Sequence, residues 1–209
     1  MSELSFTPEG HIYRLGDRVL VSVTQVLEDW QKIDFGAFAV YYNARTGMKI
    51  PADIWEAAQD RGTAVHDMLY LCLTGEGVDR EGLSPVLVPY LDQIELFILR
   101  YKPKVLLAEY MGFDEKLGYA GRLDAVVQCA GIKRVVLFDC KSGMRGQVGP
   151  QTSAYEPLAR RKLNYKGMMD RYVLDVKPKG FWFEPCGLAQ DFEYFKYRLW
   201  SYKYERGNK

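Results

Sequence analysis

The sequence predicts an α/β fold in which helices flank a central mixed sheet and a helical addition precedes the core. Three observations lead to this prediction. Hydrophobic residues recur at helical spacing before residue 101 and after residue 189, whereas residues 104–141 divide into three strands joined by short turns. The apolar run Val135–Phe138 is continuous, as expected of a central strand that is covered on both faces.

The first fifty residues form the predicted N-terminal addition. Ser22 and Gln25 are three residues apart, a spacing typical of a capping box at the start of a helix. A turn-forming Leu-Gly-Asp at residues 15–17 precedes them. The predicted elements are a hairpin over 11–21, a helix over 22–30 and a short helix over 35–46, which ends before Gly47.

The predicted core begins with the clearest helix of the N-terminal half, which starts near Pro51 and stops at Gly75. Short turns rich in glycine and charge join the three strands that follow later, so we expect an antiparallel meander. A helix carries Gln151 and Tyr155, and Pro157 is expected to kink or end it. The remaining predicted elements are a helix over 84–101, strands over 104–111, 119–128, 134–141, 171–176 and 180–183, and a helix over 189–204.

Composition places the chain among ordinary soluble proteins. It has 209 residues, of which 48% are hydrophobic and 26% are charged. No stretch approaches the roughly 20 apolar residues that a membrane span needs. The polar N-terminus lacks the pattern of a secretory signal. We therefore expect a cytoplasmic protein that has no membrane partner.

Charge and cysteine content limit the kinds of binding and metal sites that we expect in the protein. The net charge of +1 is low for a strong non-specific DNA binder, although cations held at an acidic metal site would restore attraction for phosphate. The four cysteines include no closely spaced pair, so we expect no iron–sulfur cluster, zinc ribbon or disulfide framework. No phosphate-binding glycine motif is present, so we expect no nucleotide cofactor.

Two carboxylates and a lysine form the strongest candidate site. Asp139 and Lys141 are two residues apart on a predicted strand, so their side chains leave the same face. Asp124 precedes Asp139 by 15 residues across a turn, which allows the two carboxylates to sit side by side on neighbouring strands. Adjacent carboxylates repel each other unless a cation holds them, and oxygen ligands suit Mg²⁺ or Mn²⁺.

A histidine on the predicted helix that ends at Gly75 is a further candidate. Gly62 precedes His66 by one helical turn and lies on the same face of the helix. A glycine inside a helix costs about 1 kcal/mol of helix propensity. It also removes a side chain beside the imidazole and leaves room for another group to approach.

Taken in order, these motifs resemble the PD-(D/E)XK nucleases, most closely their RecB-type branch, which includes stand-alone phage and bacterial exonucleases. The matching elements are Arg-Gly-x-x-x-His at 61–66, Gly-Arg-Leu-Asp at 121–124, Leu-Phe-Asp-Cys-Lys-Ser-Gly at 137–143, and Gln151 with Tyr155 four residues on. The resemblance covers about residues 55–200. It implies a restriction-endonuclease-like core in a single domain over 1–209, with residues 1–50 as the addition.

The resemblance also implies a metal site. The implied ligands are His66, Asp124, Asp139 and the backbone carbonyl of Cys140. Glu109 matches an acidic position that, in some relatives, contributes to a second metal or to the outer shell. The implied cofactor is Mg²⁺ or Mn²⁺.

Catalytic and DNA-binding residues follow from the same comparison. Lys141 is expected to be the catalytic lysine and to act with Asp124 and Asp139. Gln151 and Tyr155 complete the expected catalytic set, because they contact the DNA backbone or support Lys141. The residues expected to bind nucleic acid are Arg61, Gln151, Tyr155, Arg160 and Arg161.

The implied function is a divalent-metal-dependent deoxyribonuclease, with an exonuclease on DNA ends or single strands in recombination or repair as the leading form. A recombination or single-strand-binding protein fits as a partner, and a bacterial or phage-infected cell as the setting. Three alternatives stay open: a restriction-type endonuclease, a nuclease that acts on RNA, and a non-catalytic module that uses the same fold to bind DNA or a protein partner.

Overall fold

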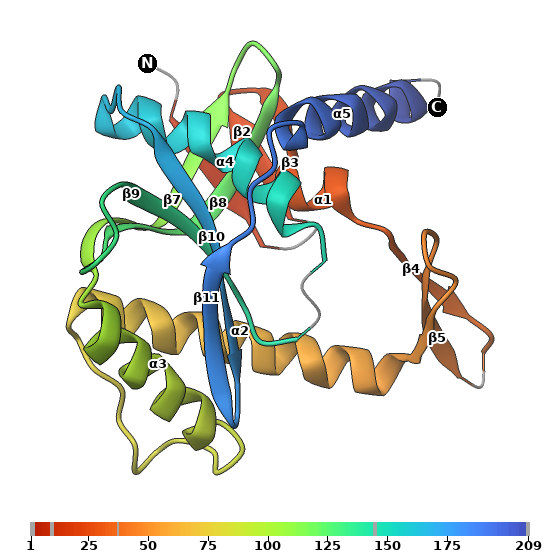
Figure 1. Cartoon of the computed structure of the whole chain (residues 1–209). Coiled ribbons are helices and arrows are strands. Elements are labelled where there is room, and N and C mark those ends of the chain that lie inside the picture. Colours follow the sequence, from red (N-terminus) through yellow and green to blue (C-terminus); the bar gives the residue numbers. More distant parts are fainter. Residues whose placement is uncertain (1–2, 9–10, 37, 144–145, 208–209) are drawn as a thin grey trace.

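The structure of the chain is a computed structural model, and it describes residues 3–8, 11–36, 38–143 and 146–207. An eight-stranded mixed sheet lies between helices, and a second, three-stranded sheet stands beside it (Figure 1). The elements, in chain order, are β1 (Leu4–Thr7), β2 (Ile12–Leu15), β3 (Arg18–Ser22), α1 (Val23–Leu27), β4 (Trp30–Asp34), β5 (Ala39–Asn43), β6 (Lys49–Pro51), α2 (Ala52–Thr74), α3 (Val88–Tyr101), β7 (Lys104–Asp114), β8 (Tyr119–Gln128), β9 (Val135–Lys141), α4 (Val148–Leu163), β10 (Met169–Lys177), β11 (Gly180–Pro185) and α5 (Asp191–Gly207).

The large sheet is built around β8. Strands β7, β8 and β9 form the expected antiparallel meander, and α4 carries the chain from β9 to β10, which is parallel to β9. On its other side β10 pairs with the antiparallel edge strand β11. At the opposite end, β3 pairs in parallel with the start of β8 and continues into the hairpin of β2 and β1. The prediction of a mixed sheet flanked by helices is therefore confirmed.

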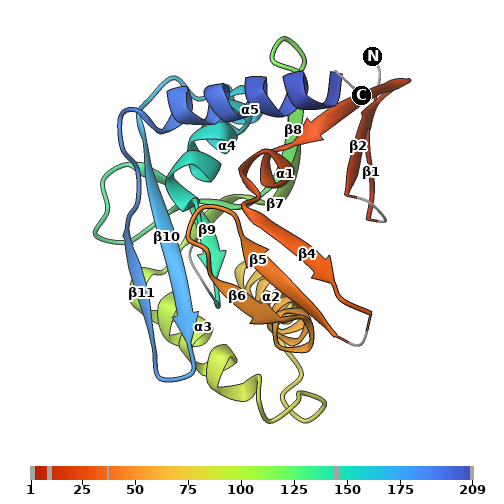
Figure 2. The same ribbon diagram turned by 90° about the vertical axis from the view of Figure 1, so that its right-hand side faces the viewer.

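Helices cover both faces of this sheet, α4 and α5 on one and α2 and α3 on the other (Figures 1 and 2). A hydrophobic core lies on each face. The residues of β9 alternate between them, because successive side chains of a strand point to opposite faces. Val135 and Leu137 pack in the core beneath α4 and α5, whereas Val136 and Phe138 pack in the core beneath α2 and α3. All four side chains are buried, as expected of a central strand.

The N-terminal addition is mainly β-structure, so the prediction of a helical addition is wrong. The predicted hairpin over 11–21 is confirmed by β2 and β3. The predicted helix over 22–30 ends at Leu27, and Trp30 already begins β4. The predicted helix over 35–46 does not form, because its residues belong to an antiparallel sheet of order β4-β5-β6.

Local chemistry explains the difference in this segment. Gly36 has a φ of 81°, a conformation that favours glycine, and it turns the chain between β4 and β5. β-Branched residues then meet across the hairpin, with Ile33 opposite Val40. The Asn43 side chain accepts hydrogen bonds from the backbone amides of Arg45 and Thr46, which closes the next turn. These cross-strand and turn contacts outweigh the helical spacing of the same residues.

The remaining elements match their predicted positions closely. α2 ends as expected, with Gly75 in the left-handed conformation at its C-terminus. Pro157 was expected to kink or end α4, and it does not end it: the helix continues to Leu163, and Asn164 caps it. Among the described residues, none of the helices is both long enough and apolar enough to cross a membrane.

Candidate functional site

The site begins at an interruption in the pairing of β8. One edge of β8 pairs with β7 along its length, so β3 and β9 share the other edge. β3 pairs with Tyr119 and Ala120, and β9 pairs with residues 125–127. The Gly-Arg-Leu-Asp motif at 121–124 falls between these two partners. A Cβ on Gly121 would lie 2.6 Å from Cε1 of Tyr155, so the glycine lets the Tyr155 ring pack against the strand.

Asp124 links β8 to both β9 and α2. The register of β8 and β9 pairs Ala125 with Phe138, and one further step places Asp124 opposite Asp139, as the sequence predicted. The backbone amide of Cys140 donates a 2.6 Å hydrogen bond to Oδ2 of Asp124. The same oxygen lies 3.4 Å from Nδ1 of His66 on α2. Three elements therefore meet at one carboxylate.

Glu109 on β7 approaches Asp124 from the remaining side. The register pairs Ala108 with Ala125 and Tyr110 with Leu123, which places Glu109 opposite Asp124. Its backbone φ is 46°, in the left-handed region that residues other than glycine rarely adopt. Among the described residues, His66, Glu109 and Asp124 each offer a ligand atom within 4.8 Å of the others.

Asp139 and Lys141 form a second group on the α4 side of the sheet. Nζ of Lys141 lies 2.6 Å from Oδ2 of Asp139 and 3.4 Å from Oε1 of Gln151. The Gln151 amide in turn donates to the hydroxyl of Tyr155 at 3.4 Å. Four of the five expected catalytic residues, Asp139, Lys141, Gln151 and Tyr155, are therefore linked by these contacts, although Asp139 is not part of the three-residue ligand set.

The charges of these groups shift each other's pKa values. The carboxylate of Asp124 raises the pKa of His66 to about 9. Burial opposes ionisation of Asp124, but the charge of His66 and its hydrogen bond outweigh that effect and lower the pKa of Asp124. Burial, together with the Asp124 charge, raises the pKa of Glu109 to about 7. His66 and Glu109 therefore hold protons at neutral pH that a bound cation would have to displace.

The second group is equally perturbed. Burial raises the pKa of Asp139 to about 6, even though the adjacent ammonium opposes the shift. Burial also opposes the charge on Lys141, but Asp139 and Asp124 outweigh it and raise the pKa of Lys141 above its usual range. Lys141 is therefore a cation at neutral pH, held at the end of a buried strand.

The residues present fit a divalent cation. Imidazole nitrogen and two carboxylates within 4.8 Å form a suitable ligand set for Mn²⁺ or Mg²⁺. Oδ1 of Asp139 is buried and has no hydrogen-bond partner among the described residues, so this oxygen can accept a contact from a bound cation. Cys140, whose carbonyl is a further expected ligand, is fixed beside Asp124 through its amide.

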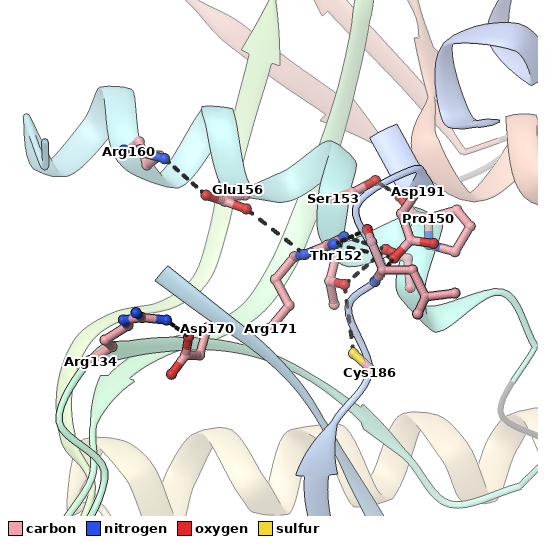
Figure 3. A network of polar contacts seen from close by, with 12 residues as sticks. Arg134, Pro150, Thr152, Ser153, Glu156, Arg160, Asp170, Arg171, Cys186 and Asp191 are labelled. Carbon is pink, nitrogen blue, oxygen red and sulfur yellow. Dashed lines mark hydrogen bonds and ion pairs between the residues drawn. The ribbon is translucent and has the colours of Figure 1, made fainter. Parts of the chain in front are cut away.

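A buried polar network anchors the start of α4, which carries Gln151 and Tyr155 (Figure 3). Arg171 on β10 donates hydrogen bonds to the carbonyls of Gly149 and Leu188 and lies 3.2 Å from Oδ2 of Asp191 at the start of α5. Its side chain is only 12% exposed. Arg171 thus ties β10, α4 and α5 together behind the site.

The predicted nucleic-acid contacts separate in space. Arg61 lies one residue before Gly62 and lines the same cleft as His66. Arg160 and Arg161 lie in the last turn of α4, away from Gln151 in its first turn. Arg160 donates to the carbonyls of Lys166 and Gly167, and Arg161 donates to Phe113 and Asp114. The structure therefore does not bring these two arginines together with the other site residues.

A cleft of about 620 Å³ opens from this site toward the small sheet. Its far wall includes residues that the sequence did not single out, which are Trp30, Asn43, Arg45 and Trp55. The sequence offers no clear signal for Trp30, Asn43 and Arg45, because the apolar spacing of their segment fits a helix as well as a strand. A strand assignment would have folded this segment back onto the start of α2.

No protein-family model matches the sequence, and no curated protein shows significant similarity to it.

Proposed function

We propose that the protein is a divalent-metal-dependent nuclease that hydrolyses phosphodiester bonds in DNA, built on the restriction-endonuclease-like core of the PD-(D/E)XK superfamily. The observation that carries the proposal is the junction of two groups. A set of three metal-ligating side chains and a buried carboxylate–lysine pair meet where β8 and β9 lie side by side. Such an arrangement is costly to bury unless a cation and an anionic substrate complete it.

His66, Glu109 and Asp124 would hold the cation, and Asp139 lies beside them. When bound, Mg²⁺ or Mn²⁺ supplies Lewis acidity that polarises a phosphoryl oxygen and lowers the pKa of water. Lys141 carries a positive charge at the inner end of the cleft, where it can stabilise the negative charge that develops on the phosphate. Asp139 and Gln151 fix the direction of its ammonium group.

Cleavage of end-labelled linear DNA tests the proposal. Single- and double-stranded substrates are incubated with pure protein and Mg²⁺, Mn²⁺ or EDTA. Lys141→Ala and Asp124→Asn are compared with Lys104→Ala, which removes an exposed lysine at the start of β7. We expect metal-dependent cleavage that falls by at least about 100-fold in the two site variants, as for loss of a group that stabilises transition-state charge, and that is unchanged in the control.

Absence of cleavage with Mn²⁺ present would overturn the proposal in favour of a binding module. Equal rates for Lys141→Ala and Lys104→Ala would also contradict it, because they would point to a contaminating enzyme. Covalently closed circles and RNA of the same sequence, included in the same series, separate an exonuclease on DNA from an endonuclease or a ribonuclease.

A further inference from the structure

The cleft connects the candidate catalytic groups with the small sheet formed by β4, β5 and β6. His66, Lys141 and Gln151 line its inner end, and residues of β4 and β5 line its outer end. β5 and β6 rest on α2, which forms the wall between the two ends (Figure 2). A substrate whose scissile group lies at Lys141 therefore extends along α2 toward this sheet.

Two aromatic rings that line the cleft, Trp30 and Trp55, together with Tyr41, which stacks on Trp55, form what we call the aromatic wall. The ring centroids of Trp30 and Trp55 are 4.5 Å apart, and Tyr41 stacks on Trp55 with centroids 4.9 Å apart and planes inclined by 20°. Trp30 and Trp55 line the cleft. Trp55 lies 11 residues before His66 on α2, which places the aromatic wall roughly 16 Å from the metal-ligating end. A short run of nucleotides spans this distance.

A cation lies between the aromatic wall and the catalytic end. Arg61 lines the cleft six residues after Trp55 on α2, and Nε of its guanidinium is buried without a hydrogen-bond partner among the residues that the structure describes. Gly62 follows Arg61 and leaves free space on this side of the cleft. The nearest side-chain atom to a Cβ built on Gly62 is Oγ of Ser142, at 3.7 Å. Along α2 the cleft thus presents rings, then a positive charge, then the metal-ligating groups.

This order matches a single nucleic-acid strand, whose bases and phosphates need aromatic faces and cations respectively. In a duplex the faces of the bases are already stacked on their neighbours, so a duplex cannot use the aromatic wall.

We propose that the aromatic wall binds unpaired bases of single-stranded DNA, with Arg61 on the intervening phosphate, so that single strands or frayed ends are the substrate class of the site. This binding proposal rests on the proposed nuclease function only in placing the scissile phosphate at Lys141. Binding by the wall itself does not require cleavage.

The test measures binding in the Lys141→Ala background, where cleavage does not consume the substrate. Fluorescence anisotropy of a labelled oligothymidylate and of a labelled blunt hairpin duplex is followed in the presence of Mg²⁺. Trp55→Ala and Trp30→Ala remove rings of the wall, and Trp55→Phe keeps an aromatic face. Trp182→Ala, which removes a half-exposed tryptophan on the edge strand β11, is the matched control.

We expect Trp55→Ala and Trp30→Ala each to weaken binding of the oligothymidylate roughly 5- to 150-fold, the range for loss of one base–aromatic stack. Trp55→Phe should stay within a few-fold of the parent, Trp182→Ala should match it, and binding of the duplex should be weaker in every case. Circular dichroism of each variant verifies that it is folded.

Unchanged single-strand affinity in both alanine variants, or tighter binding of the duplex, would overturn the inference. The two proposals fail separately. If single-strand binding depends on Trp55 but the wild-type protein cleaves no DNA, the proposed nuclease activity is wrong and the proposed binding by the aromatic wall stands. If the protein cleaves DNA but neither Trp55→Ala nor Trp30→Ala changes single-strand binding, the proposed role of the aromatic wall is wrong and the proposed nuclease activity stands.

Discussion

Glu109 carries two unfavourable features at once. Its backbone is in the left-handed region, with φ of 46°, and burial beside Asp124 raises the pKa of its carboxyl to about 7. Strained backbone of this kind persists where the surrounding structure holds it, and it is concentrated at functional sites. Two cationic groups oppose this shift, His66 and Arg122, and Nη1 of Arg122 lies 3.7 Å from Oε2 of Glu109.

The pKa of Glu109 predicts how stability depends on pH. The folded pKa of about 7 lies above the ordinary value of 4.5, so the folded state holds this proton more tightly than the unfolded state. The resulting stabilisation is complete below pH 4.5 and is lost as pH rises through 7. Glu109→Gln should therefore stabilise the metal-free protein at pH 8 by about 1–3 kcal/mol, after allowance for solvent screening, and by far less at pH 5.

Urea unfolding in EDTA at the two pH values measures this effect. Glu115→Gln is the control, because Glu115 is exposed in the turn after β7. A Glu109→Gln variant that is less stable than wild type at pH 8, or that changes stability equally at pH 5 and pH 8, would contradict the account of this residue.

At the scale of elements, the position of α4 depends on Arg171. Arg171→Met leaves Asp191 buried without its cation and removes the hydrogen bonds to Gly149 and Leu188. Breaking a buried ion pair from one side typically costs about 3–5 kcal/mol, and we expect a loss of that size in urea unfolding. The matched control is Arg134→Met, which breaks the solvent-exposed pair with Asp170 shown in Figure 3 and should cost less than about 1 kcal/mol.

Similar losses in the two arginine variants would contradict the role given to Arg171. In that case the ends of α4 and α5 would be held by their hydrophobic contacts alone.

Elements with strong local signals were predictable from the sequence. α2 has Pro51 before its first turn and a left-handed glycine at its end, and β9 begins with the continuous apolar run Val135–Phe138. The segment 30–51 was not predictable, because its apolar spacing fits a helix as well as a strand. The pairing of Ile33 with Val40 and the turn at Gly36 favour the strand over the helix. Neither feature can be inferred from the spacing of the apolar residues alone.

At the scale of the whole molecule, the site gathers residues that are distant in sequence. The adjacency of Asp124 and Asp139 was predictable, because a single hairpin joins their strands. The place of Glu109 in the ligand set depends on the register of β7 and on its own unusual φ, neither of which the sequence specifies. The aromatic wall was missed for a similar reason: Trp30 and Trp55 meet only because the small sheet folds back onto α2.

Measurement of Mn²⁺ binding by electron paramagnetic resonance tests whether His66, Glu109 and Asp124 hold a divalent cation. We expect wild-type protein to bind Mn²⁺ more tightly at pH 8 than at pH 6.5, because Glu109, with a pKa of about 7, loses its proton and the neutral fraction of His66, with a pKa of about 9, increases. Asp124→Asn should weaken binding by at least about 10-fold, whereas Asp170→Asn, at the exposed pair on β10, should not. Equal Mn²⁺ affinity in the two variants, or no binding by the wild type at pH 8, would contradict it.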